Sequence, residues 1–262
     1  SMIDRKIALN RALNHNLEAM AKQLYDYWFV QFDFPDADGK PYKSSGGKMV
    51  WNEKLKREIP NGWSVQKLDN IEQNIITGKT PPTAEPDNFD GDIPFITIDD
   101  IRGNTFVYNT QRTLTQKGAD TQKSKWLPAN SLCVSCIGTI GQIGFTTMPS
   151  HTNQQINTIV FENEYNRAYI YFSLCLHFEN ASTKTGNILK NMNKEEFASI
   201  PLICPPTTLV ERFHQIMSPT FEEIKVSFGE IHRLTKLRDE LLPLLMNGQV
   251  SVNYDLAVAY GV

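Results

Sequence analysis

Apolar side chains recur at helical spacing in two long segments, one near each end of the chain. In the first, at about residues 3–29, a seven-residue repeat marks one side of a predicted helix. Its first register is Ile3, Asn10, Leu17 and Leu24, its second, three residues on, is Lys6, Leu13, Met20 and Tyr27, and the residues that widen the stripe are Ile7, Ala21 and Trp28. We expect the polar Asn10 at a core position to fix the register or the choice of partner.

The second segment is a longer predicted helix at about residues 208–246. Thr208 and Glu211 have the spacing of an N-terminal capping box. Pro219 lies inside the segment, where a proline is expected to kink or interrupt a helix. The repeat here consists of Ile224, Ile231, Leu234, Leu241 and Leu245. The two apolar stripes predict an antiparallel helical pair; two helices packed separately on a globular core are the alternative.

Short apolar runs bounded by Gly, Pro, Asn and Asp replace the helical pattern in the middle of the chain. They predict strands at residues 93–98, 131–137, 143–146, 156–161 and 200–203, and helices at residues 165–178 and 194–198. The predicted fold class is therefore α+β: one globular domain with a mixed sheet, flanked by two long helices that pack as an antiparallel coiled coil. The expected segments are a first helix (1–32), an extended linker (33–60), the domain (61–204), a second long helix (205–250) and a tail (251–262).

Charge is informative through its placement more than through its sum, because the 262-residue chain has a formal net charge of only −3. The sequence shows no signal peptide and no apolar run long enough to span a membrane, so we expect a cytoplasmic protein without a membrane partner. One basic stretch, residues 111–126, includes Lys123 and Lys125. A second, residues 180–194, combines lysines with hydroxyls and amides. Such groups contact DNA phosphates and base edges, and a solvated polar loop is the alternative.

Catalytic signatures are scarce. Cys133-Val-Ser-Cys136 has the spacing of a metal or redox pair, but no second pair follows, and the surrounding residues predict a buried strand. We expect structural thiols, and a zinc- or thiol-dependent enzyme is the alternative. The chain has no Walker A loop, and its 5 histidines are scattered. The sequence therefore predicts no catalytic residue, no metal site and no cofactor in this chain.

Several stretches, taken in chain order, resemble the specificity (S) subunit of type I DNA restriction–modification systems. The stretch from Asp4 to Asp33 is similar to the end of that family's central conserved helix. The domain motifs are Pro60-Asn-Gly-Trp63, Thr77-Gly-Lys-Thr-Pro81, Ile93-Pro-Phe-Ile96, Asp99-Asp-Ile101, Ser135-Cys-Ile-Gly-Thr-Ile-Gly141, Asn153-Gln-Gln-Ile-Asn157 and Thr185-Gly-Asn187. Ile200-Pro-Leu-Ile-Cys-Pro-Pro206 leads into the second long helix, whose end from Leu237 to Gly248 also resembles the family.

The resemblance implies a non-catalytic subunit that reads one half of a split DNA sequence and docks partners through its helices. The implied partners are double-stranded DNA, methyltransferase (M) subunits and restriction (R) subunits, with a second copy of the chain as a further candidate. S-adenosylmethionine, ATP and Mg²⁺ would be used by the partner subunits. A full family member carries two recognition domains, so this chain resembles the second half of one.

Within this resemblance, one set of polar and basic residues is expected to face DNA. These residues are Lys79, Thr80, Lys184, Thr185, Asn187 and Lys190, with Lys123 and Lys125 behind them. A helical protein-interaction scaffold without a nucleic-acid role is the competing hypothesis from another functional class.

Overall fold

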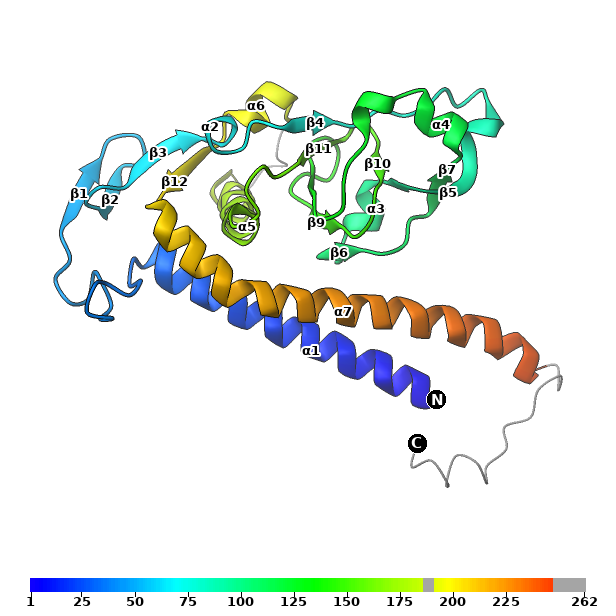
Figure 1. Cartoon of the computed structure of the whole chain (residues 1–262), viewed down its shortest axis with the longest axis horizontal. Coiled ribbons are helices and arrows are strands. Elements are labelled where there is room, and N and C mark those ends of the chain that lie inside the picture. The colour runs from blue at the N-terminus through cyan, green and yellow to red at the C-terminus, as the bar shows by residue number, and fades with distance from the viewer. Residues whose placement is uncertain (186–190, 247–262) are drawn as a thin grey trace.

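The computed structural model describes residues 1–185 and 191–246, and its longest elements are helices at the two ends of the chain (Figure 1). Helix α1 (Met2–Tyr25) continues into a π-helix, η1 (Asp26–Val30), and α7 (Thr207–Met246) runs beside them in the opposite direction. Asn10 Nδ2 donates to Glu230 Oε2 at 2.7 Å, and the rings of Trp28 and Phe213 lie 5.8 Å apart. The predicted antiparallel pair is confirmed.

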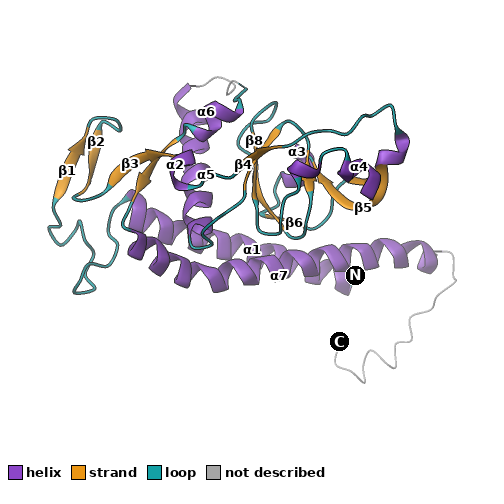
Figure 2. Ribbon diagram, turned by 45° about the horizontal axis from the view of Figure 1, so that its top comes forward, coloured by secondary structure: helices purple, strands orange, loops and turns teal. Residues whose placement is uncertain are grey.

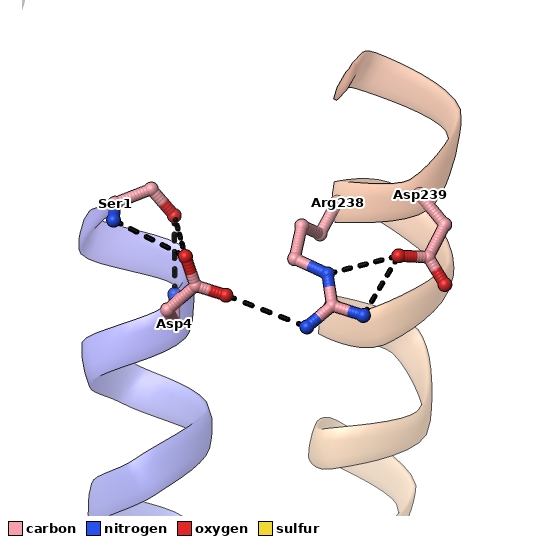
Figure 3. Close-up of polar contacts among 4 residues, drawn as sticks. All are labelled: Ser1, Asp4, Arg238 and Asp239. Atoms are coloured by element: carbon pink, nitrogen blue, oxygen red, sulfur yellow. Dashed lines mark hydrogen bonds and ion pairs between the residues drawn. The ribbon is translucent and has the colours of Figure 1, made fainter. Parts of the chain in front are cut away.

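A charged bridge holds the outer end of this pair (Figure 3). The Asp4 carboxylate accepts hydrogen bonds from the Ser1 hydroxyl at 2.8 Å and from Arg238 Nη1 at 3.4 Å. Arg238 also donates to Asp239 on its own helix, at 2.7 Å from Nη2. The Ser1 hydrogen bond, first, and the positive groups around it hold the pKa of Asp4 below its usual value.

The second row of buried side chains on α1 follows each residue of the first register by four positions, as Ile7, Asn14 and Ala21 show. The sequence pattern predicted a row that follows by three positions. The buried side chains of α1 are Ile7, Asn10, Asn14, Ala21 and Tyr25. The predicted second register is wrong, since Leu13, Met20 and Tyr27 are 40%, 63% and 37% exposed. A heptad seam alternates steps of three and four residues, and the predicted and the observed seam differ only in which step comes first. Their mean spacing is the same, so spacing alone does not select between them.

Pro219 does not interrupt α7, contrary to one expectation from the sequence. The helix is continuous and contains both Pro219 and Pro243. A proline removes one backbone donor from a helix. Met217 and Ile224, on either side of Pro219, are buried, so tertiary packing holds the helix through this position.

A five-stranded sheet forms the centre of the globular part, in the order β4–β11–β8–β9–β6. Its strands are β4 (Ile75–Thr77), β11 (Ile156–Ile159), β8 (Leu132–Ser135), β9 (Ile143–Thr146) and β6 (Phe106–Val107). Strand β6 pairs parallel with β9, and the other neighbours pair antiparallel. The predicted mixed sheet is confirmed.

Three smaller sheets complete the strand set of the described residues. They are β10 (His151–Thr152) with β5 (Phe89–Ile96) and β7 (Arg112–Leu114), β1 (Met49–Asn52) with β2 (Arg57–Pro60), and β3 (Ser64–Lys67) with β12 (Pro201–Cys204). The helices between them are α2 (Leu68–Ile71), α3 (Ile98–Ile101), α4 (Gln116–Asp120), α5 (Asn166–Thr185) and α6 (Lys194–Ala198), with 3-10 turns η2 (Pro86–Asn88) and η3 (Lys123–Lys125).

The segment predicted as an extended linker, residues 33–60, instead contains the β1–β2 hairpin. Phe34 is buried, and its ring stacks on Tyr42 at 4.7 Å and on Trp63 at 5.1 Å. The turn-forming residues of this segment therefore make turns within a folded unit and not a linker, because aromatic side chains pack the segment against the core.

The globular part lies along α7 over much of the helix, as two views agree (Figures 1 and 2). Phe221 of α7 packs edge-on against Tyr171 of α5 at 5.7 Å and against Phe145 of β9 at 5.9 Å. One turn farther along α7, Lys225 Nζ donates to Asn130 Oδ1 at 3.2 Å. These contacts fix the orientation of the globular part on the helical pair. None of the helices among the described residues is long and apolar enough to cross a membrane.

Candidate nucleic-acid interface

The loop after β4 packs tightly against the loop after β10. Lys79 N donates to Thr152 O at 3.0 Å. A Cβ on Gly78 would lie 2.2 Å from Asn153 O and 2.2 Å from Thr152 Oγ1, so the two backbones approach this closely only because residue 78 is glycine. Two of the sequence motifs, one containing Gly78 and the other Asn153, therefore meet at one end of the five-stranded sheet.

A side-chain hydrogen bond joins the same two loops. Thr80 Oγ1 donates to Gln154 Oε1 at 2.6 Å, although 74 positions separate the two residues. Thr80 was predicted from the sequence as a site residue and Gln154 was not. The signal for Gln154 was present in the Asn153-Gln-Gln motif, but nothing in the spacing of that motif indicates which amide faces solvent.

A third motif reaches the same place through the turn between β8 and β9. Gly138 and Gly141 have φ values of +81° and +83°, a conformation that favours glycine and lets the chain turn tightly here. Cys136 N donates to Gln155 O at 2.8 Å, which ties the turn to the amide loop. Gly138 N donates to Asn191 Oδ1 at 3.2 Å, which ties it to the segment that follows residue 190.

The residues that flank the basic turn η3 also contact β10. The ring of Trp126, directly after η3, lies 4.5 Å from the ring of His151. Gln122 Nε2 and His151 Nδ1 are 3.4 Å apart. His151 is fully buried, and burial lowers its pKa to about 4, so its ring is neutral at physiological pH and adds no positive charge. Two of the predicted DNA-facing loops thus rest on the same short strand, β10.

The cations of this region differ in how far they are already paired. Lys79 is exposed, and neither it nor Lys125 makes an ion pair with another described residue. Lys123 Nζ lies 3.7 Å from Asp120, in an exposed pair. Lys117 lies 3.5 Å from Asp87, and the Arg112 guanidinium covers the Phe89 ring at 4.3 Å. Lys79 and Lys125 are therefore the lysines of these loops that are available to a phosphate.

The predicted site residues divide into two groups. The structure places Lys79, Thr80, Lys123 and Lys125 on the two loops around β10. Asn187 and Lys190, and the side chains of Lys184 and Thr185, lie outside the described residues. The described chain resumes at Asn191, beside the β8–β9 turn.

The helical pair exposes apolar side chains that the seam does not use. On α1, Met2, Leu9 and Met20 are 61%, 58% and 63% exposed. On α7, Val226, Leu237 and Leu244 follow one face of the helix and are 63%, 44% and 37% exposed. Apolar side chains in a row along a helix mark a candidate protein-binding surface.

Cys133 lies in the buried strand β8, and Cys136 is buried directly after that strand ends. Cys133 and Cys136 are free thiols that belong to two different clusters of the core. Burial raises the pKa of Cys133 to about 12 and that of Cys136 to about 11, so both are protonated and poor nucleophiles at neutral pH. No group of three or more His, Cys, Asp or Glu side chains that could hold a metal ion occurs within residues 1–185 and 191–246.

Two curated proteins are similar to this chain along most of its length. The specificity subunit of type I restriction enzyme HindI from Haemophilus influenzae is 31% identical, over 95% of this chain and 65% of the relative. The specificity subunit of type I restriction enzyme MjaIX from Methanocaldococcus jannaschii is 25% identical, over 96% of this chain and 57% of the relative. The chain thus spans 57% to 65% of the length of these relatives.

Solved structures share the fold at low sequence identity. The S subunit of a type I restriction–modification system from M. genitalium superposes with a TM-score of 0.57 at 15% identity, over 92% of this chain and 57% of that one. The HsdS subunit from Thermoanaerobacter tengcongensis gives a TM-score of 0.50 at 12% identity, over 95% of this chain and 56% of that one. The family model for the type I restriction modification DNA specificity domain matches residues 60–231. Since that match covers more than half of the chain, the protein belongs to the family of type I restriction–modification DNA specificity domains.

Proposed function

We propose that this chain is a non-catalytic DNA sequence-specificity subunit that reads one half of a bipartite target. The observation that carries the proposal is the convergence of three family motifs on one end of the sheet, within the region that matches the specificity-domain family. Loops that are held together by backbone hydrogen bonds can present side chains to DNA in one fixed arrangement.

The candidate lysines would position the chain on DNA through contacts with phosphates. Lys79 and Lys125 would contact phosphates, with Lys123 beside them, and Lys184 and Lys190 would add further phosphate contacts. Because the net charge of the chain is −3, DNA binding would depend on a few local contacts and on partner subunits, and it would weaken steeply with salt.

The helical pair would serve as spacer and docking strut. Methyltransferase subunits would bind the exposed apolar side chains of α1 and α7, and restriction subunits would join through them. S-adenosylmethionine, ATP and Mg²⁺ would be used by those subunits. A second copy of this chain is the other candidate for the same apolar surface.

Charge reversal in the assembled complex tests the proposal. Duplex binding by the chain with its methyltransferase subunit would be measured against salt concentration for Lys79→Glu, Lys125→Glu and the double variant Lys184→Glu with Lys190→Glu. We expect weaker binding, and a salt slope reduced by about 1 for each phosphate contact that is lost. Lys56→Glu, on the β1–β2 turn and 73% exposed, is the matched control and should bind as the parent does. Unchanged binding in all three loop variants would contradict the assignment.

A protein-interaction scaffold without a nucleic-acid role is the second candidate. The exposed apolar side chains of α1 and α7 favour it, since a scaffold needs such a surface and a DNA reader alone does not. It predicts that the complex assembles through the helices but shows no preference among DNA sequences at any salt concentration.

A further inference from the structure

Three adjacent amide side chains form the loop between β10 and β11, and they differ in what they bind. Asn153 Oδ1 accepts a hydrogen bond from Gln155 N at 3.1 Å, and Asn153 Nδ2 donates to Gln155 Oε1 at 3.0 Å. These two amides therefore hold the shape of the loop. Gln154, between them, is exposed, and its side chain turns to Thr80 of the other loop.

The backbone beneath Gln154 is fixed from both sides. Asn153 N donates to Ile96 O at 3.3 Å, which joins the loop to β5. Lys79 N donates to Thr152 O at 3.0 Å, and the close contact at Gly78 leaves no space for these backbones to slide. The backbone here is already ordered, so binding a ligand would have to order only the Gln154 side chain, which the Thr80 hydrogen bond restrains.

The Thr80 hydrogen bond determines which groups of Gln154 remain free. The Thr80 hydroxyl occupies one lone pair of Oε1 at 2.6 Å. The second lone pair of Oε1 and both hydrogens of Nε2 have no hydrogen-bond partner among residues 1–185 and 191–246. An amide that can accept and donate side by side pairs with the N6 and N7 edge of adenine in the major groove.

We propose that Gln154 is a specificity-determining residue that reads an adenine in the half-site, and that Thr80 is the positioning residue that sets its amide plane. Lys79, next in the chain to Thr80, binds the adjacent phosphate and supplies affinity without sequence preference. The inference rests on the proposed function, because it names the base that the DNA-reading site selects.

The test uses the full chain assembled with its methyltransferase subunit and a panel of duplexes. The panel carries each of the four bases at every position of the half-site, and the readout is the ratio of methylation rates between bases at one position. For Gln154→Ala we expect the preference for adenine at a single position to fall about 10-fold or more, with the other positions unchanged. Gln154→Glu should shift the same position toward cytosine, since a carboxylate only accepts hydrogen bonds.

Two further variants separate positioning from binding. Thr80→Val should reduce the same ratio by less than Gln154→Ala does, and Lys79→Ala should slow methylation of all duplexes equally. Gln66→Ala is the matched control, because Gln66 is also an exposed amide near a hydroxyl, with Nε2 3.4 Å from Ser64 Oγ. If both Gln154 variants keep every base ratio, or slow all duplexes by one common factor, the inference fails while the proposed function stands. If the parent complex shows no base preference at any position, both fail.

Discussion

The ring of Tyr108 lies directly against the backbone of Gly229, in the middle of α7. A Cβ at position 229 would sit 3.0 Å from Cζ and 3.1 Å from Oη of Tyr108, and the same ring stacks on His232 at 6.5 Å. Glycine inside a helix costs about 1 kcal/mol relative to alanine. The globular part therefore contacts α7 at a position where glycine lowers the stability of the helix and leaves room for the Tyr108 ring.

This contact predicts a reversal in the effect of one substitution. Gly229→Ala should fail to stabilise the protein, because the added methyl group meets the Tyr108 ring. In a Tyr108→Ala background the same change should stabilise the helix by about 1 kcal/mol. Chemical unfolding of the four proteins of this double-mutant cycle gives both values. Equal effects of Gly229→Ala in the two backgrounds would show that the ring does not press on position 229.

Replacing each of the two buried asparagines of α1 by leucine should have a different effect on stability. Both polar side-chain atoms of Asn14, Nδ2 and Oδ1, are buried and have no hydrogen-bond partner among the described residues. Asn14→Leu should therefore raise the free energy of unfolding, by about 1–3 kcal/mol. Asn10 donates to Glu230 at 2.7 Å, and this hydrogen bond is the main reason that the pKa of Glu230 is lowered. Asn10→Leu removes that partner and should give no such gain. Thermal unfolding compares the two variants, and a lower melting temperature for Asn14→Leu than for Asn10→Leu would reject this ranking.

Elements that local sequence patterns define can be predicted from the sequence, and elements that form by pairing with distant residues cannot. Residues 143–146 and 194–198 form β9 and α6 with the predicted bounds, because local apolar runs and an Asn193 cap define them. Strand β10 has only two residues and exists through its parallel pairing with β5. No local propensity identifies so short an element.

The candidate site was predicted in part, for the same reason. Lys79 and Thr80 are recognisable from charge and motif, but the partner of Thr80 is 74 positions away. The role of Gln154 depends on that bond, so it emerges only in three dimensions. The phase of the α1 seam is similar: Leu13 and Asn14 both continue an acceptable repeat, and packing against α7 selects Asn14.

Burial of histidine predicts that the protein loses stability in mild acid. Burial lowers the pKa of His151 from 6.5 to about 4, and it also lowers the pKa values of His177 and His214. Below pH 6.5 the histidines of the unfolded chain bind protons, and the buried His151 of the folded protein does not. The free energy of unfolding is therefore highest above pH 6.5 and falls as the pH drops toward 4. For His151 the loss across this window is about 3 kcal/mol.

Urea midpoints between pH 7 and pH 4.5 measure this loss. His151→Gln should flatten the pH dependence, and His15→Gln, at an exposed site on α1, should leave it as in the parent. A pH profile that is identical in His151→Gln and the parent would show that His151 does not control the effect.

Thiol chemistry tests the enzyme alternative built on Cys133 and Cys136. Because burial raises the pKa values of these thiols to about 12 and about 11, neither should react with a thiol reagent until the protein unfolds. Ellman titration with and without denaturant measures this, and elemental analysis of the purified protein measures zinc. Rapid labelling of either cysteine in the native protein, or one zinc ion per chain, would revive the alternative.

Mapping methylated adenines is the most direct test of DNA reading by this chain. The chain would be co-expressed with the methyltransferase subunit of its own system in a host without other adenine methylation. We predict methylation confined to one split sequence motif, in which the half-site read by this chain changes when the loops around Thr80 and Gln154 are altered. An assembled complex that methylates no motif, or methylates adenines without regard to sequence, would contradict the account.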